Sequence, residues 1–399
     1  MIERTHYLER LSDWRDKDVI KVVSGVRRCG KSTLMEMFKR HLIGQGVDAQ
    51  NIVHINLELL ENEHLLEYHV LHDEVLRRCE NDGMHYVLID EVQNVPDFQK
   101  AVDSLYVRSN IDLYITGSNS KLLKGTLATL LSGRYVEIEM LPLSFAEYCA
   151  GVGGGAQSLQ RTWSDYLHDG SLPATVSLRG NDSLIRDYLQ GVLNTVLLKD
   201  VAERLSISNV ASLNAVTEFL FDNIGNLATA KGIADAMTSA GAKISSDTVS
   251  SYIQGLCASY IFYEVPRYDI RGKRVLKQEK KYYAVDMGMR RVMCSNNVRD
   301  TGRILENVVY LELLRREREV YVGRSAAGEI DFVTNGVGGR KYYQVAESVA
   351  ETSTLERELR SLQALRDNYP KTLITLDDVR QVSYDGITQI YALDWLKGV

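Results

Sequence analysis

Apolar runs alternate with amphipathic stretches over the first third of the chain. The runs at residues 19–23, 52–57, 85–90, 111–117 and 135–140 have the length and apolar content of buried β-strands. Between them, hydrophobic residues recur at three- and four-residue spacing, as Leu34, Phe38 and Leu42 do, which predicts helices. Five strands alternating with helices predict a parallel sheet covered on both faces, which binds ligands at the carboxyl ends of its strands.

The segment GVRRCGKST joins the first predicted strand to the first predicted helix. It has the form G-x-x-x-x-G-K-[ST], in which backbone N–H groups and the positive end of the following helix cradle phosphates. Lys31 is expected to reach the β- and γ-phosphates, and Ser32 to bind Mg²⁺. The alternative is a chance glycine turn, but the strand before the loop and the helix after it favour a phosphate site. The predicted nucleotide-binding residues of the loop are Gly25, Val26, Arg27, Arg28, Cys29, Gly30, Lys31, Ser32 and Thr33.

Two acidic residues, Asp90 and Glu91, follow the third apolar run. An acidic pair at a strand end is weak by itself, because turns favour such residues. Downstream of a phosphate loop it predicts a magnesium site shared by Asp90 and Ser32, with Glu91 placed to orient or deprotonate the attacking water. A nucleotide sensor that did not hydrolyse would have little need of Glu91, so the pair favours an ATPase.

Two residues in this region have open interpretations. Asn119 follows the fourth predicted strand and is a candidate catalytic residue that senses the γ-phosphate, or else it caps a helix at 121–130. Phe98 could grip a polymer in a pore, but its helical spacing with Val102 and Leu105 favours core packing.

The middle of the chain combines a helical lid with a basic hairpin. Leu-rich helical segments are expected at 159–205, and two helices followed by a hairpin at 206–298 describe a winged helix. The hairpin carries seven basic and two acidic side chains over residues 266–281, which favours contact with the DNA backbone. A solvated hairpin or a subunit contact is the alternative. The candidate DNA-binding residues are Arg271, Lys273, Arg274, Lys277, Lys280 and Lys281.

The last hundred residues show the order helix, strand, strand, strand, helix, strand, which is that of the restriction-endonuclease-like fold. Glu306, Asp331 and Gln344 fall where the PD-(D/E)XK motif of that fold places its metal ligands. The lysine expected two residues after the last ligand is replaced by Ala346, and Gln344 stands where an acid is usual. Lys341 or Lys371 could substitute for that lysine. A degenerate nuclease fold that docks DNA or a partner is the simpler interpretation.

Composition and charge limit the compartments and partners that we expect for this protein. The 399 residues carry a formal net charge of −6, which argues against a chain coated in nucleic acid but not against a local basic patch. The five cysteines lack C-x-x-C spacing and predict a reducing environment and no zinc site. The start is charged and no apolar run is long enough to cross a membrane, so we expect a cytoplasmic protein that does not contact membranes. No NKxD sequence is present to bind guanine, which favours ATP with Mg²⁺ as the nucleotide.

The motifs GVRRCGKST, LIDEVQ, ITGSNS and SGRYVEIEMLPLSFAEY together resemble the AAA-type ATPase domain of a large family of bacterial and archaeal ATP-binding proteins. In that family the ATPase domain is joined to a C-terminal domain without an assigned function. The resemblance implies that Arg134 is an arginine finger or a γ-phosphate contact, including one that completes a neighbouring subunit's site. A solvated or salt-bridged Arg134 is the alternative. A homo-oligomer, such as a ring, is expected by analogy with AAA-type enzymes.

We therefore expect an α/β protein in four parts. These are a P-loop AAA+-like ATPase domain at 1–158, a helical lid at 159–205, a winged helix at 206–298 and a restriction-endonuclease-like domain at 299–399. The leading functional hypothesis is an ATP-hydrolysing protein that acts on DNA, with branched recombination intermediates among its candidate substrates. The alternative is a nucleotide-dependent switch in stress, defence or toxin control that binds a protein partner.

Overall fold

A computed structural model describes residues 2–118, 133–153, 158–294, 300–317, 319–336, 338–379 and 381–398, without the side chains of residues 277 and 278. The chain divides into two compact units. The first comprises the residues up to Pro142 together with Ala258–Tyr260, and the second comprises Leu143–Cys257 and the residues from Ile261 onward.

The first unit is built on a five-stranded parallel sheet with the strand order β2-β3-β4-β1-β5. This confirms the predicted parallel sheet. The strands are β1 (Ile20–Ser24), β2 (Ile52–Asn56), β3 (His85–Asp90), β4 (Ile111–Gly117) and β5 (Tyr135–Glu139). Because β1 lies between β4 and β5, the loop that follows β1 leaves the sheet from its interior and not from an edge strand.

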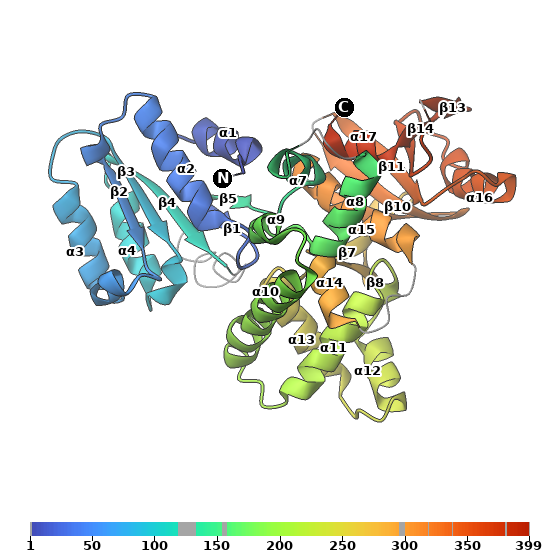
Figure 1. Ribbon diagram of the computed structural model, residues 1–399, viewed down its shortest axis with the longest axis horizontal. Coiled ribbons are helices and arrows are strands. Elements are labelled where there is room, and N and C mark those ends of the chain that lie inside the picture. Colours follow the sequence, from blue (N-terminus) through green and yellow to red (C-terminus); the bar gives the residue numbers. More distant parts are fainter. Residues whose placement is uncertain are drawn as a thin grey trace. The chain divides into compact units, whose positions relative to one another are not determined.

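Helices cover both faces of this sheet (Figure 1). They are α1 (Thr5–Asp13), α2 (Lys31–Gly44), α3 (Tyr68–Arg78) and α4 (Phe98–Tyr106). On the face of α3 and α4, alternate strand residues such as Val22 and Ile55 pack against Val75 and Val102 in one hydrophobic cluster. On the face of α2, the rings of Phe38 and Tyr114 lie 4.8 Å apart. The side chain of Phe98 belongs to the first cluster, as its spacing predicted.

The second unit begins with helices. They are α7 (Phe145–Gly151), α8 (Leu159–Asp169), α9 (Pro173–Leu178), α10 (Asp182–Thr195), the π-helical segment η4 (Val196–Glu203), α11 (Val210–Asp222), α12 (Ala230–Ser239), α13 (Ser246–Ala258) and α14 (Met287–Met293). Polar N-caps begin several of them. The Ser144 hydroxyl and the Glu147 carboxylate form a capping box on α7, and the buried carboxylate of Asp286 caps α14.

A nine-stranded mixed sheet completes the second unit, with the order β13-β14-β12-β11-β10-β9-β7-β8-β6. Its strands are β6 (Leu227–Ala228), β7 (Phe262–Asp269), β8 (Arg274–Ala284), β9 (Val320–Ser325), β10 (Gly328–Gly336), β11 (Gly339–Ala346), β12 (Lys371–Thr375), β13 (Val382–Tyr384) and β14 (Ile387–Tyr391). The helices α15 (Thr301–Arg316), α16 (Thr352–Gln363) and α17 (Ala392–Lys397) accompany it. The predicted order of helix, three strands, helix and strand is present as α15, β9, β10, β11, α16 and β12.

The compact units do not follow two of the predicted domain boundaries. The first unit ends at Pro142 and not at residue 158, because α7 packs on α8 and α17 of the second unit. No boundary of a compact unit falls at residue 298 either, because β7 of the hairpin pairs in parallel with β9 and joins the C-terminal sheet. The sequence pattern marks the order of the elements but does not show which strands pair across the chain.

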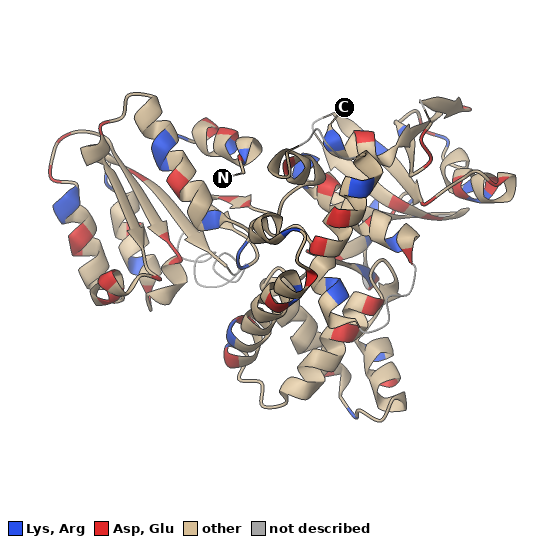
Figure 2. Ribbon diagram, in the orientation of Figure 1, with Lys and Arg blue, Asp and Glu red and all other residues tan. Residues whose placement is uncertain are grey.

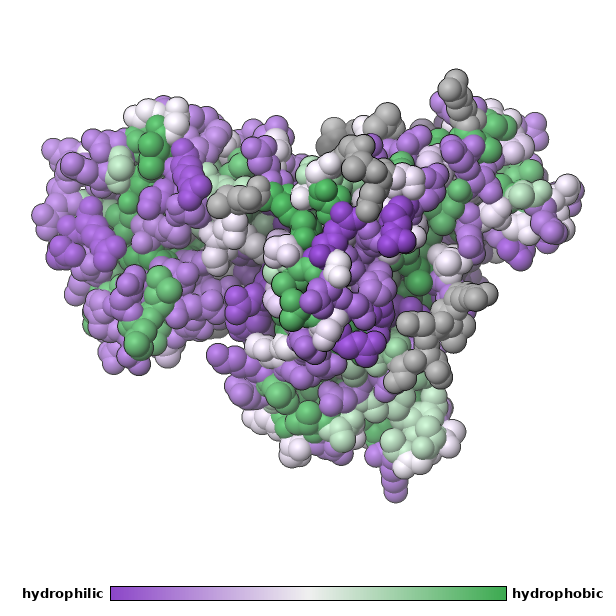
Figure 3. All heavy atoms as spheres, in the orientation of Figure 1, coloured by the Kyte–Doolittle hydropathy of each residue, from purple (hydrophilic) through white to green (hydrophobic). Residues whose placement is uncertain are grey.

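Charged side chains of both signs are interspersed on the outer helices, as Figure 2 shows for α3 and α16. In α3, Glu74 forms ion pairs with both Arg77 and Arg78. Hydrophobic residues on the face drawn in Figure 3 form patches that hydrophilic residues interrupt. Among the helices that the structure describes, none is both long enough and apolar enough to cross a membrane.

Candidate nucleotide-binding site

The glycine-rich loop closes around the amino end of α2. Gly25 has a φ of 145°, and a Cβ built there would lie 2.2 Å from the backbone oxygen of Met140, so only glycine fits. Gly30 has a φ of 105° and directly precedes the first residue of α2. The loop thus turns the first N–H groups of α2 toward the carboxyl ends of the strands, which is the arrangement that binds an anion.

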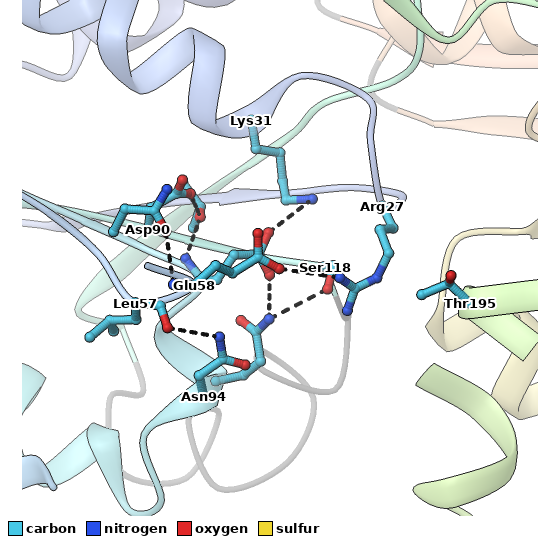
Figure 4. Close-up of polar contacts among 12 residues, drawn as sticks. Arg27, Lys31, Leu57, Glu58, Asp90, Asn94, Ser118 and Thr195 are labelled. Carbon is cyan, nitrogen blue, oxygen red and sulfur yellow. Dashed lines mark hydrogen bonds and ion pairs between the residues drawn. The ribbon is translucent and has the colours of Figure 1, made fainter. Parts of the chain in front are cut away.

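Lys31 is held inside this loop. Its residue is 4% exposed, and its ammonium donates hydrogen bonds to the carbonyl oxygens of Gly25 at 3.2 Å and Val26 at 3.3 Å. The same ammonium lies 3.6 Å from a carboxylate oxygen of Glu91. Figure 4 shows Lys31 and Asp90 of this site. Lys31 therefore points along the loop toward the acidic end of β3.

Asp90 lies at the bottom of the site and is fully buried. Its Oδ1 accepts a hydrogen bond from the Thr116 hydroxyl, while its Oδ2 has no hydrogen-bond partner among the described residues. Burial raises the pKa of Asp90, and hydrogen bonds from Ser32 and Thr116 partly oppose that rise. A buried carboxylate oxygen without a partner, next to a serine hydroxyl, fits a Mg²⁺ ion that would be held by Ser32 and Asp90.

Glu91 occupies a strained position beside Asp90. Its φ is 53°, and its backbone N–H donates to Thr116 Oγ1 at 2.9 Å. Its carboxylate accepts a hydrogen bond from the Gln93 side-chain amide, which also lies 3.4 Å from Ser118 Oγ. A left-handed backbone at a residue other than glycine is costly and is often found at functional sites. Gln93 was not predicted, although it stands two residues after Glu91 in LIDEVQ.

The other predicted loop residues have different environments. Val26 and Cys29 are buried, and burial raises the pKa of the Cys29 thiol, so its side chain packs as a small hydrophobic group. Arg28 and Thr33 are exposed. Arg27 forms an ion pair of 3.3 Å with Glu58 from the segment that follows β2.

Comparison with known proteins agrees with this geometry. A family model described as an AAA domain matches residues 17–149, and a model described as a domain of unknown function matches residues 160–300. A Haemophilus influenzae protein, described as uncharacterized, is 38% identical over 399 residues, which is 99% of this chain and 98% of that protein. The chain belongs to the same family as that protein, and its first part is an AAA domain.

Two more distant proteins extend the comparison. A Methanocaldococcus jannaschii protein, also described as uncharacterized, is 28% identical over 381 residues, covering 90% of this chain and 82% of that protein. The solved structure of a Walker-type ATPase from Pyrococcus abyssi superimposes with a TM-score of 0.53 at 16% identity, covering 73% of this chain and 96% of that one. That similarity concerns the fold and matches the parallel P-loop core of the AAA domain.

The structure describes only one of the two other predicted catalytic residues of the AAA domain. Asn119 lies outside the described residues. Arg134 directly precedes β5, and because β1 and β5 run in parallel from Ile20 and Tyr135, it lies at the edge of the sheet opposite the phosphate loop. Its guanidinium pairs with Asp103 at 2.5 Å. Arg134 is thus salt-bridged in this structure and lies at the opposite edge of the sheet from its own phosphate loop.

The basic hairpin is less uniform than its sequence indicated. Arg271, Lys273 and Arg274 are exposed at the turn between β7 and β8. The side chain of Lys277 lies outside the described residues, and Lys280 forms an ion pair with Glu264. These residues leave a basic tip of three described side chains.

Lys281, which the sequence predicted to bind DNA, is instead buried. It is 4% exposed, and its ammonium lies 2.8 Å from Glu306, 2.7 Å from Glu329 and 4.0 Å from Asp331. Alternation along β8 turns Lys281 into the protein beside its outward neighbour Lys280. The acidic partners come from α15 and β10, which the hairpin sequence alone does not show.

The predicted C-terminal metal ligands are likewise not all brought together. Gln344 donates a hydrogen bond to Glu358 of α16 at 2.9 Å, whereas Glu306 and Asp331 converge on Lys281. Burial and the neighbouring Glu306 raise the pKa of Asp331. Among the described residues, no group of three or more His, Cys, Asp or Glu side chains could hold a metal ion.

The two lysines considered as substitutes in that site are engaged elsewhere. Lys341 pairs with Glu317 at 2.7 Å, and Lys371 donates to the backbone oxygens of Leu365 and Asp367. Neither contact is with Glu306 or Asp331, so the cation beside these acids is Lys281.

Proposed function

We propose that the AAA domain binds ATP with Mg²⁺ and hydrolyses it to ADP and phosphate. The observation that carries this proposal is the convergence of Lys31, Asp90 and Glu91 at the carboxyl edge of the parallel sheet, with Lys31 and Glu91 3.6 Å apart. A domain that only bound nucleotide would not need a second carboxylate in this position.

Each side chain has a distinct role in the proposed reaction. Lys31 would leave the carbonyl oxygens of Gly25 and Val26 and place its charge on the β- and γ-phosphates. Ser32 and Asp90 would hold the Mg²⁺ ion, which neutralises charge on the phosphates. Glu91, positioned by the Gln93 amide, would orient or deprotonate the water that attacks the γ-phosphate.

We further propose that hydrolysis is coupled to DNA. The order α11, β6, α12, α13, β7 and β8, with β6 paired to β8, supports a winged helix whose wing is the β7–β8 hairpin. Its tip presents Arg271, Lys273 and Arg274, which can neutralise backbone phosphates. The exposed positions of α13 are Ser246, Asp247, Ser251 and Gln254, which offer no cation for base edges. Binding would therefore depend on the DNA backbone or shape, as for branched recombination intermediates, and a homo-oligomer would act on it.

A specific observation favours the second candidate, a nucleotide-dependent switch that binds a protein partner. Ion pairs inside the protein already engage Lys280 and Lys281, so the hairpin has less free positive charge than its sequence indicates. In that case the nucleotide state would control a protein contact, and DNA would not change turnover.

Phosphate release decides between the candidates. The wild type is measured alone and with single-stranded, double-stranded and four-way-junction DNA, beside Lys31→Ala. We expect basal turnover to fall by orders of magnitude in Lys31→Ala, because transition-state charge stabilisation is lost. We also expect DNA to stimulate the wild type severalfold, whereas a wild type indifferent to every DNA supports the switch.

Charge reversal tests the hairpin tip. The triple variant Arg271→Glu, Lys273→Glu, Arg274→Glu should keep basal turnover and lose the stimulation by DNA. A matched control reverses three other exposed cations, Lys17, Arg366 and Lys397. Equal loss in both triple variants would mean that net charge, and not the tip, governs binding. Basal turnover that is unaffected by Lys31→Ala would overturn the proposal that the AAA domain hydrolyses ATP.

A further inference from the structure

A buried ammonium group stands where a nuclease-like domain would hold a metal ion. The side chain of Lys281 is 5% exposed, and those of Glu306 and Asp331 are each 11% exposed. The three come from β8, α15 and β10, and Glu329 at the start of β10 adds a fourth charged group. Charges this deeply buried must be compensated locally, and here Lys281 does so for several carboxylates at once.

The carboxylate oxygens are already engaged in ways that oppose a metal. Glu306 Oε1 accepts from both the Lys281 ammonium at 2.8 Å and the Tyr283 hydroxyl at 2.6 Å. Asp331 Oδ2 accepts the backbone N–H of Val345 at 2.8 Å, and its Oδ1 faces Lys281. While the ammonium lies between these carboxylates and Gln344 donates to Glu358 of α16, too few oxygens are left for the several ligands that Mg²⁺ or Ca²⁺ requires.

The segment between α11 and β6 also approaches the cluster. Gly225 lies against Glu306, and a Cβ built on this glycine would be 3.3 Å from Glu306 Oε2. Its backbone N–H donates to the carbonyl oxygen of Tyr282, which fixes this glycine next to β8. A metal ion would therefore have to displace the ammonium to reach both carboxylates.

The same cluster joins the hairpin to the C-terminal elements. Next to Glu306, the side-chain amide of Asn307 makes two hydrogen bonds to the backbone of Ala284. Its NH₂ group donates to the Ala284 carbonyl oxygen at 2.8 Å, and its oxygen accepts from the Ala284 N–H at 2.7 Å. Tyr283 stacks on Tyr310 of α15 with ring centroids 4.5 Å apart. The ion cluster thus lies within a continuous contact between β8 and α15.

We propose that the Lys281 ammonium takes the place of a divalent cation between Glu306 and Asp331, so that this site binds no metal and instead fastens the β7–β8 hairpin to the C-terminal sheet. The nuclease-like arrangement is then retained as a structural joint. The inference is independent of ATP hydrolysis and concerns a different part of the chain.

Manganese binding tests this proposal on the full chain. The variants Ser32→Ala and Asp90→Asn are combined as a background that removes the phosphate-loop site, and nucleotide is left out. Binding of Mn²⁺ is measured by electron paramagnetic resonance, together with the melting temperature. The background should show no Mn²⁺ site that depends on Asp331. A site that disappears on Asp331→Asn would overturn the proposal.

Removal of the ammonium should create the site that it fills. In the same background, Lys281→Met should gain one Mn²⁺ site per chain, at least about tenfold tighter than any in the background, with a rise in melting temperature on adding Mn²⁺. The matched control is Lys280→Met, which removes the neighbouring ammonium that pairs with Glu264. This control should gain neither a Mn²⁺ site nor a rise in melting temperature on adding Mn²⁺. A folded Lys281→Met that binds no more Mn²⁺ than the control would overturn the proposal. If Lys281→Met folds poorly, Lys281→Arg should restore folding without Mn²⁺, and the Asp331→Asn comparison still decides.

Discussion

The ammonium of Lys31 and the carboxylate of Glu91 lie 3.6 Å apart, with side chains only 3% and 8% exposed. Two buried charges of opposite sign at this distance neutralise one another, so neither is free for its proposed role until the phosphates arrive. The γ-phosphate would attract Lys31 and leave Glu91 to the water. The pair is therefore expected to separate when ATP binds.

Replacement of Glu91 should slow ATP hydrolysis without weakening ATP binding. Glu91→Gln keeps the size and the contact to Gln93 but cannot accept a proton, so turnover should fall by roughly 10²–10⁴-fold while ATP affinity is retained. Affinity is measured by calorimetry and turnover by phosphate release. Gln93→Ala, which removes only the amide that positions Glu91, should have a smaller effect. Equal turnover in Glu91→Gln and the wild type would contradict the role of the carboxylate.

Gly25 should not tolerate a side chain. Alanine there would place its Cβ 2.2 Å from the Met140 oxygen at a φ of 145°, so the loop must shift and nucleotide affinity should fall by more than tenfold. Gly46 provides a matched control, because its φ is also positive, at 89°, but a Cβ would meet nothing within 4 Å. Gly46→Ala should cost about 1 kcal/mol of stability and leave affinity unchanged. Similar affinities in the two variants would refute this view of the loop.

Substitutions of Arg134 and of its partner Asp103 distinguish an arginine finger that acts on a neighbouring subunit from a structural ion pair. Such fingers contribute roughly 10³–10⁵-fold to turnover, so Arg134→Ala should be nearly inactive at all concentrations, and wild-type turnover per subunit should rise steeply with protein concentration. Asp103→Ala breaks the same ion pair but keeps the arginine, and should retain activity. Equal losses in both variants, or turnover that stays flat on dilution, would assign Arg134 a structural role.

The part of the site that sequence could predict is local. The loop at residues 25–33 and the pair Asp90 and Glu91 each depend on neighbours within a few positions, and the alternation of apolar runs is enough to place them at one edge of a sheet. Lys281 could not be assigned in this way, because its partners Glu306 and Asp331 follow it in separate elements. Period-two alternation could have shown that Lys280 and Lys281 face opposite sides of β8, but not which of them is buried.

Pairing between distant strands explains the remaining differences. Arg134 directly precedes an apolar strand, which its sequence shows, but only the parallel pairing of β5 with β1 places it at the edge away from the phosphate loop. The C-terminal strands β13 and β14 were not predicted, because each is short and the first of them is largely exposed. Pairing between strands far apart in the sequence therefore cannot be predicted from the pattern of apolar residues.

A buried ion pair should make a large contribution to the first unit. Lys21 of β1 and Asp112 of β4 are in contact, with side chains 0% and 3% exposed, and Asp112 also accepts from Tyr114 at 2.8 Å. Asp112→Ala would leave the Lys21 charge buried and unpaired and should destabilise this unit by about 3–5 kcal/mol. The double variant Lys21→Met, Asp112→Leu removes both charges and should be closer to wild type. A double variant less stable than Asp112→Ala would contradict this explanation.

The stability measurement can be confined to the first unit. Trp14 belongs to it, whereas Trp163 and Trp395 belong to the second unit, so replacing the latter two with phenylalanine leaves one fluorescent reporter. Urea unfolding followed by Trp14 fluorescence then reports this unit without assuming that the whole chain unfolds in one step. The same background serves every stability comparison made on the AAA domain.

His54 should make the first unit less stable in mild acid. Burial lowers the pKa of this imidazole, and the nearby Lys39 adds to that effect, although Asp90 and Glu36 oppose it. The unfolded chain therefore binds a proton at a pH where the folded chain does not, and stability should fall as pH drops below about 6.5. His54→Gln removes this titration, so its stability relative to wild type should improve between pH 7 and pH 5.5. The exposed His69 is the control, since His69→Gln should keep the wild-type pH dependence. A relative stability of His54→Gln that does not change with pH would show that the imidazole keeps its ordinary pKa in the folded unit.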